Sequence, residues 1–196
     1  MKPPIISTRR IGRLEVYLLA TFTLTYAKLL EKFTIIPILN EQNEPVCVLQ
    51  KVERSSIGKL FNIGLLLTTQ QALPIHFETC TTLGIPLFRV TPTLLTKGMS
   101  HQLILPDETV IPIQRKTVQL LESSYSFTMD GLIFLFEQDF TSTAYLYCND
   151  QKIASAKLVE NELVKQSIIF NLLESEDILF IALLAALYQS LFALSK

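Results

Sequence analysis

The feature that most constrains the fold is a run near the C-terminus, from Ile178 to Leu194 (ILFIALLAALYQSLFAL). It is rich in Ala and Leu, which are strong helix formers, and contains no Gly or Pro. We therefore expect a helix over about residues 176–194, with Ser175 as its N-cap and acidic residues in its first turn. A helix that is apolar on every side must be buried, either in a membrane or inside the protein.

Length and polar interruptions favour burial inside the protein. At about 1.5 Å per residue the run spans roughly 25 Å, whereas the bilayer core is about 30 Å thick. Tyr188, Gln189 and Ser190 interrupt the run, and no basic cluster follows it. A core helix is the favoured interpretation. A tail anchor over residues 178–194, with a cytosolic N-terminal β domain, is the alternative, and a helix at an oligomer interface is a third.

The rest of the chain, over about residues 14–170, shows the pattern of strands. Ser124–Met129 alternates apolar and polar residues, as a half-buried strand does, and Asp130-Gly131 after it is a strong hairpin signal. Thr143–Cys148 and Lys152–Leu158 form a similar pair around a polar turn. Further strands are expected over Val16–Tyr26, Phe33–Leu39, Pro45–Leu49, Lys59–Thr69, Leu73–Thr79, Pro86–Val90, Leu103–Leu105, Val110–Ile113 and Val164–Phe170.

Many strands followed by one apolar helix indicate a closed architecture, because closing a sheet removes its exposed edges. The hairpin pattern gives a mainly β chain, a closed antiparallel β-barrel of about 10–12 strands. A barrel this wide cannot be filled by its own side chains alone. We therefore expect it to enclose the hydrophobic C-terminal helix, with residues 1–196 forming a single domain.

Three segments resemble the tubby C-terminal-like superfamily, which includes tubby proteins, phospholipid scramblases and LURP-one-related proteins. They are Phe33–Val48, with its strand, polar turn and strand, the late hairpin from Ser124 to Phe134 with the strand at Lys152–Ala154, and the helix from Ile178. The resemblance implies a closed β-barrel threaded by a C-terminal hydrophobic helix. In size the chain is most similar to the bacterial LURP-one-like branch.

The same resemblance implies a non-enzymatic binding or interaction module that associates with lipid or a membrane surface. Its protein or lipid partner and its oligomeric state are not predicted. The formal net charge of −1 argues against nucleic acid as a partner, because phosphate binding needs an excess of basic residues. Three widely spaced cysteines and the lack of an apolar run directly after Met1 favour a cytoplasmic protein with reduced thiols.

Candidate catalytic and metal-binding residues are few. Cys80 lies near His76 in sequence, but four residues in a strand span about 13 Å, too far for a nucleophilic pair without a bend. Together with His101 they lack the paired spacing of a zinc site. Carboxylate pairs such as Asp107-Glu108 and Glu174 with Glu176 are expected in solvated turns. We predict no catalytic residue, no metal site and no cofactor.

Small groups of basic residues are the remaining candidates for a binding role. They are Arg9, Arg10 and Arg13; Lys51, Arg54 and Lys59; and Arg115 with Lys116. Each group could contact an anionic headgroup, although nearby Glu residues dilute their charge and make solvated loops the commoner explanation.

Overall fold

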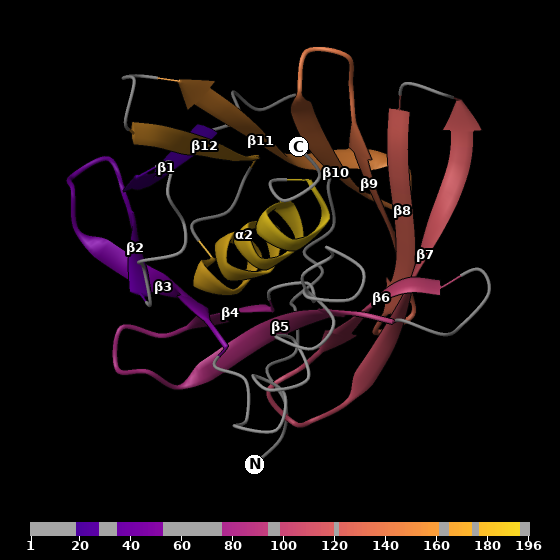
Figure 1. Ribbon diagram of the computed structural model, residues 1–196, viewed down its shortest axis with the longest axis horizontal. Coiled ribbons are helices and arrows are strands. Elements are labelled where there is room, and N and C mark those ends of the chain that lie inside the picture. The colour runs from indigo at the N-terminus through magenta and orange to yellow at the C-terminus, as the bar shows by residue number, and fades with distance from the viewer. Residues whose placement is uncertain are drawn as a thin grey trace, which may run out of the picture.

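The computed structural model describes residues 19–27, 35–52, 76–93, 99–119, 122–160, 165–173 and 177–192. These residues form twelve strands followed by the C-terminal helix α2 (Figure 1). The bounds are β1 Leu19–Ala27, β2 Ile35–Leu39, β3 Pro45–Lys51, β4 Phe77–Cys80, β5 Pro86–Pro92, β6 Met99–Ile104, β7 Val110–Gln119, β8 Glu122–Met129, β9 Leu132–Gln138, β10 Thr143–Cys148, β11 Gln151–Glu160, β12 Lys165–Leu173 and α2 Ile178–Leu191.

The strands close into an antiparallel barrel. Each strand pairs with its neighbours along the chain, and β1 pairs with β12 in a register that runs from Leu19 opposite Leu173 to Ala27 opposite Lys165. The predicted closed barrel of 10–12 strands is therefore confirmed. The strand predicted over Leu73–Thr79 overlaps β4 at Phe77–Thr79, while residues 73–75 and the strand predicted over Lys59–Thr69 lie outside the described residues.

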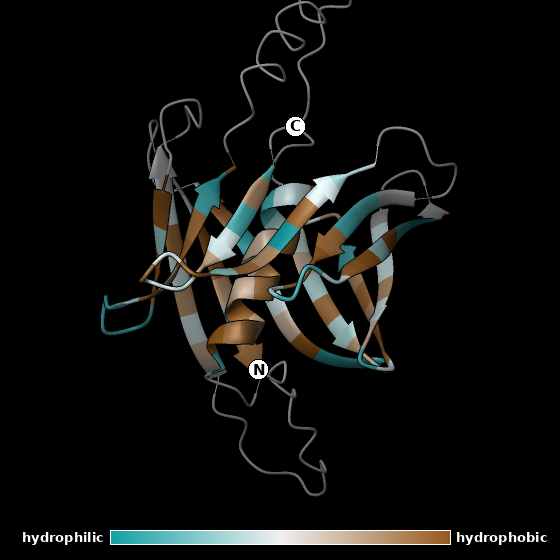
Figure 2. Ribbon diagram, turned by 90° about the horizontal axis from the view of Figure 1, so that it is seen from below, coloured by the Kyte–Doolittle hydropathy of each residue, from teal (hydrophilic) through white to brown (hydrophobic). Residues whose placement is uncertain are grey.

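Alternation along the strands separates the two faces of the barrel wall. On β8, Tyr125, Phe127 and Met129 are buried inside while Thr128 is exposed outside, as their alternation predicts. Figure 2 shows the same banding of hydrophilic and hydrophobic residues along several strands. Tight turns complete the hairpins: both residues of Asp130-Gly131 have positive φ, 52° and 77°, which a two-residue primed turn requires.

Helix α2 lies inside the ring of strands (Figure 1). Every residue from Ile181 to Gln189 is buried, and the helix packs against β3, β4, β5, β11 and β12. The core-helix prediction is confirmed. The amide of Gln189 is buried without a hydrogen-bond partner, a cost of about 1–3 kcal/mol that the apolar packing of α2 must offset.

The start of the helix differs from the prediction. Asp177, and not Ser175, is the N-cap: its side chain accepts a hydrogen bond from the Leu179 N–H at 2.9 Å, and the helix begins at Ile178. A carboxylate directly before the first helical residue reaches the free N–H groups of the first turn, which a serine two residues earlier cannot do. Helical geometry ends at Leu191, and residues 193–194 lie outside the described residues.

Among the described residues, no helix combines the length and the hydropathy that a membrane span needs.

The two ends of the barrel differ in their connections. At one end, which we call the turn end, lie the turns at residues 40–44, 81–85, 105–109, 130–131 and 149–150, and α2 starts there. The helix therefore runs from the turn end to the opposite end, where Phe192 follows its last turn. The direction of α2 along the barrel therefore determines which helix side chains meet which strands at each end.

Candidate functional site

Aromatic side chains fill the barrel interior where α2 ends. The Phe192 ring lies 5.5 Å from the Tyr125 ring, 4.9 Å from the Phe136 ring and 6.0 Å from the Tyr188 ring, measured between centroids. These contacts join the end of the helix to β8 and β9. They hold the inner face of β8 and β9 in place. The outer face of the same two strands carries the candidate site described below.

His101 and Arg115 lie beside this aromatic cluster. The register places both on the inward side of their strands near Tyr125, and the His101 ring contacts the Tyr125 ring edge-on at 6.0 Å. Burial, and secondarily the positive charge of Arg115, lowers the pKa of His101 to about 4. The imidazole is therefore neutral at physiological pH, and protonating it would place two like charges together.

This lowered pKa makes stability depend on pH. Between pH 6.5 and 4 the unfolded chain binds more protons at His101 than the folded chain, so the free energy of unfolding falls as the pH falls. We expect about 1.5 kcal/mol to be lost between pH 6.5 and pH 5. Urea unfolding at both pH values measures the loss. His101→Gln should remove most of the difference, and an equal loss in both proteins would contradict the assignment.

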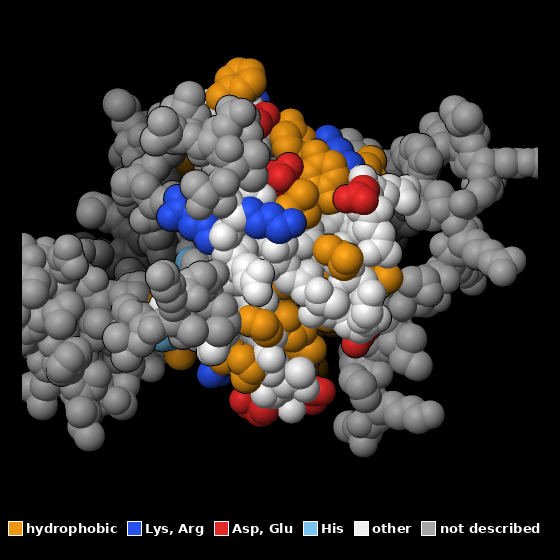
Figure 3. All heavy atoms as spheres, turned by 90° about the vertical axis from the view of Figure 1, so that its right-hand side faces the viewer, with side chains coloured by type: hydrophobic (Ala, Val, Ile, Leu, Met, Phe, Trp, Pro, Cys, Tyr) orange, Lys and Arg blue, Asp and Glu red, His pale blue; other side chains and the backbone are white. Residues whose placement is uncertain are grey.

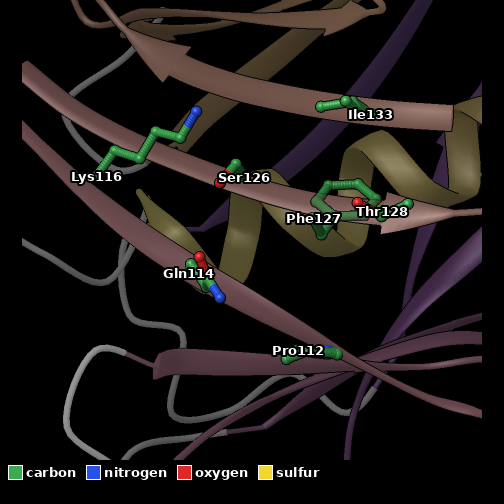
Figure 4. A pocket seen from close by; sticks show the side chains of 7 residues that line it. All are labelled: Pro112, Gln114, Lys116, Ser126, Phe127, Thr128 and Ile133. Carbon is green, nitrogen blue, oxygen red and sulfur yellow. The ribbon is translucent and has the colours of Figure 1, made fainter.

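A groove of about 260 Å³ crosses the outer face of β7, β8 and β9. Figure 3 looks onto the side of the molecule where β7 and β8 lie, and Lys and Arg side chains gather there beside hydrophobic patches. Figure 4 shows the lining side chains on three neighbouring strands. They are Pro112, Gln114 and Lys116 on β7, Ser126, Phe127 and Thr128 on β8, and Ile133 on β9.

The strand register orders this groove from a charged end to an apolar end. Lys116 lies opposite Ser124, Gln114 opposite Ser126, and Thr128 opposite Ile133. Lys116 and Ile133 therefore lie at different ends of the groove, as Figure 4 shows. The Ile133 side chain is 60% exposed, so the groove offers an apolar contact as well as a cation.

An acidic side chain adjoins the charged end. Ser124 donates a hydrogen bond from its hydroxyl to Glu137 Oε1 at 3.2 Å, and Glu137 is on β9 at the same level as Lys116. The carboxylate lowers the local positive potential without pairing directly with Lys116, for which the described residues show no ion pair. The groove thus combines one ammonium group, hydroxyl and amide donors, and an apolar end.

Such a set suits an amphiphile with an anionic head. Lys116 supplies a compact positive charge, and Gln114, Ser126 and Thr128 supply hydrogen-bond donors beside it. The exposed apolar side chain of Ile133 can contact a less polar part of the same ligand.

The structure does not bring the sequence candidates for chemistry together. Cys80 ends β4 and His76 directly precedes it, while His101 lies on β6, separated from β4 by β5. Burial raises the pKa of the Cys80 thiol to about 11, with the Glu78 carboxylate adding to the effect, so the thiol is protonated at neutral pH. The carboxylates of Asp107 and Glu108 lie in an exposed turn, as predicted.

The predicted basic groups are separated in the structure. Arg115 and Lys116 are adjacent in sequence, but alternation sends Lys116 to the outer groove and Arg115 toward His101 and Tyr125. Lys51 ends β3, on a different part of the barrel wall. Arg9, Arg10, Arg13, Arg54, Lys59, Glu174 and Glu176 lie outside the described residues.

Sequence reasoning missed the neutral part of the groove. The alternation of β8 places Ser126 and Thr128 outside, but nothing in the sequence tells which strand lies beside them. Gln114 and Ile133 join the site only through the pairing of β7 with β8 and of β8 with β9. A search for outward polar residues on hairpin neighbours would have found part of this set.

Comparison with known proteins agrees with this architecture. No curated protein and no solved structure gives a significant match. The family model described as "Tubby C-terminal like domain" matches residues 22–194, which span β2 to β12, most of β1 and the whole of α2. The match includes the groove and the buried helix, and the chain therefore belongs to the family of Tubby C-terminal like domains.

Proposed function

We propose that the protein is a non-enzymatic module that binds anionic lipid at a membrane surface through the groove on β7, β8 and β9. The single observation that carries this proposal is the order of the groove, with Lys116 at one end and the exposed Ile133 at the other. A phospholipid has the same order, a charged head followed by apolar chains. Membership in a family of tubby-like domains supports a lipid-binding role.

The expected interaction is weak and local. A basic side chain near an anionic membrane contributes about 1 kcal/mol, and this attraction falls off within a Debye length of about 10 Å. The net charge of the chain is −1, so the whole molecule is not drawn to the surface. Binding must therefore depend on Lys116 and on the orientation that brings the groove to the lipid.

Co-sedimentation with vesicles tests this function. We expect the full chain to bind vesicles that contain phosphatidylserine more tightly than vesicles of phosphatidylcholine alone, and to release them as salt rises. Lys116→Glu should weaken binding about tenfold, because it reverses one charge at the surface. Glu137→Gln should strengthen it, because it removes the carboxylate beside Lys116.

Lys157→Glu is the matched control, since it makes the same change in net charge on an exposed position of β11, away from the groove. If Lys157→Glu weakens binding as much as Lys116→Glu, the interaction depends on net charge and the groove is not its site. Equal binding to vesicles with and without phosphatidylserine would also count against the proposal.

A further inference from the structure

The turn end of the barrel carries an excess of negative charge. Its exposed carboxylates among the described residues are Glu41, Glu44, Asp107, Glu108, Asp130, Asp150 and Asp177. Lys152, at the start of β11, is the one basic side chain described at this end. These carboxylates are spread over the turns around this end of the barrel, and together they make the potential of this end negative.

Exposed aliphatic side chains gather at the same end. The large hydrophobic side chains that are exposed in the described part of the chain are Ile35, Leu83, Ile85, Val110, Ile133, Phe140 and Ile178. Five of these seven lie at the turn end; one of the five, Ile133, lines the lipid groove, and of the other four Leu83 is 87% exposed. Single exposed hydrophobic residues need no explanation, but a concentration on one end of a molecule marks a site of interaction.

Strand pairing brings part of this set into one surface. Arg89 of β5 lies opposite Ile104 of β6, and continuing that register carries the turns at 81–85 and 105–109 to the same level. Val110 lies opposite Ile104, next to the second turn. The pairing of β7 with β8 begins only at Gln114 opposite Ser126, and toward the turn end the two strands diverge around the groove, as Figure 4 shows, so the β8–β9 turn does not join this set.

We call this the turn surface and define it by Leu83, Ile85, Asp107, Glu108 and Val110. None of these residues lines the lipid groove, whose apolar end at Pro112 and Ile133 lies nearby.

Hydrogen bonds hold the two turns in fixed shapes. In the first turn, Gly84 donates its N–H to the Thr81 carbonyl at 2.9 Å, and Ile85 donates its N–H to the Thr81 hydroxyl at 3.1 Å. In the second, Thr109 donates its N–H to Asp107 Oδ1 at 3.0 Å. A surface already ordered before binding loses little conformational entropy when a partner docks.

We propose that the turn surface docks a protein partner through a segment that carries basic side chains around aliphatic ones. The aliphatic residues of that segment would cover Leu83, Ile85 and Val110, while its Lys or Arg side chains would face Asp107 and Glu108. Charge complementarity selects this partner over the others. An anionic membrane would repel each carboxylate by about 1 kcal/mol, and a second copy of the same surface would present like charges to it.

Fluorescence anisotropy with a designed peptide tests this docking on the full chain. The probe is a labelled amphipathic helix of Leu and Lys, compared with a version in which Glu replaces Lys and one in which Ser replaces Leu. We expect the Leu/Lys peptide to bind, with an affinity that falls as salt rises, and both altered peptides to bind at least tenfold more weakly.

Two double variants separate the apolar and the charged contributions. Leu83→Ser with Ile85→Ser should weaken binding of the Leu/Lys peptide at least tenfold. Asp107→Asn with Glu108→Gln should weaken it several-fold and flatten its salt dependence. All four positions are exposed, so a thermal melt should show both proteins folded. Lys116→Glu is the control, and it should leave peptide binding unchanged while vesicle binding weakens about tenfold.

Two results would overturn the proposal. Equal affinity of the wild type and the Leu83/Ile85 variant for the Leu/Lys peptide would show that this surface is not the docking site. Loss of phosphatidylcholine vesicle binding in that variant, with peptide binding intact, would assign the turn end to a membrane. Lys116→Glu and the two double variants are each measured for both vesicle binding and peptide binding. Failure of the lipid proposal can therefore be distinguished from failure of the docking proposal.

Discussion

Deleting Ile178–Lys196 is expected to prevent the chain from folding. The deletion removes the helix that fills the barrel, and side chains such as Leu184 and Leu187 are fully buried there. Each large apolar side chain contributes about 1.5–3 kcal/mol, so the loss of several exceeds a usual total stability of 5–15 kcal/mol. Thermal melting followed by circular dichroism measures the outcome, and the truncated protein should show no cooperative transition.

Removal of Ser195 and Lys196 alone is the control for this deletion, because it leaves α2 intact. A truncated barrel without residues 178–196 that is soluble and melts cooperatively would contradict the account. In that case the strands close without the helix, and the alternative of a tail anchor would have to be taken up again.

Ala185→Arg is expected to abolish soluble folded protein. Ala185 is 1% exposed, in the middle of α2 and surrounded by buried helix residues on both sides in sequence. An unpaired charge in a dry interior costs far more than a domain of this size can lose. The yield of soluble, cooperatively melting protein is the measurement, and a yield equal to that of the wild type would contradict the packing described for this position.

Ala185→Leu is the milder companion variant and separates packing from charge. The extra side-chain volume in a filled barrel should cost about 1–3 kcal/mol, measured by urea unfolding. A helix that faced lipid would tolerate the same change or gain from it. Ala182→Leu and Ala186→Leu belong in the same series, because Ala182 and Ala186 are also fully buried. Ala182 lies on the same face as Ala185, about one turn earlier, whereas Ala186 is turned by about 100° from it. An unchanged stability for all three would count against a tightly filled barrel.

The architecture could be predicted from the sequence because its strongest signals are local. Alternation at Ser124–Met129 and the Asp130-Gly131 turn each depend on residues next to one another in the chain, and the structure has β8, its turn and β9 there. The run from Ile178 could be assigned to the core because it is short for a bilayer and apolar on all sides. The closure of the sheet into a barrel could then be predicted, because a helix that is apolar on all sides needs an enclosed interior to bury it.

The candidate site could be predicted only in part, because it depends on lateral pairing. Arg115 and Lys116 appear equivalent in sequence, yet a strand sends neighbouring side chains to opposite faces, and the starting face is set by register. The prediction of Ser175 as the helix N-cap was wrong because several polar residues before Ile178 are able to cap a helix. The path of the backbone decides which of them does so, and in the structure it is Asp177. The bacterial origin and the cytoplasmic location remain predictions.

The central functional claim is that the β7–β9 groove faces the lipid, and a probe on the groove tests it most directly. An environment-sensitive fluorophore can be attached at Gln114→Cys, which lines the groove, or at Thr82→Cys in the exposed β4–β5 turn. Both variants carry Cys148→Ser. Cys47 and Cys80 are buried, and burial raises their thiol pKa to about 12 and about 11, so neither should react.

On vesicles that contain phosphatidylserine, the probe at position 114 should shift its emission to shorter wavelength, because lipid replaces water around it, while the probe at position 82 should not change. A shift at position 82 with none at position 114 would contradict the account.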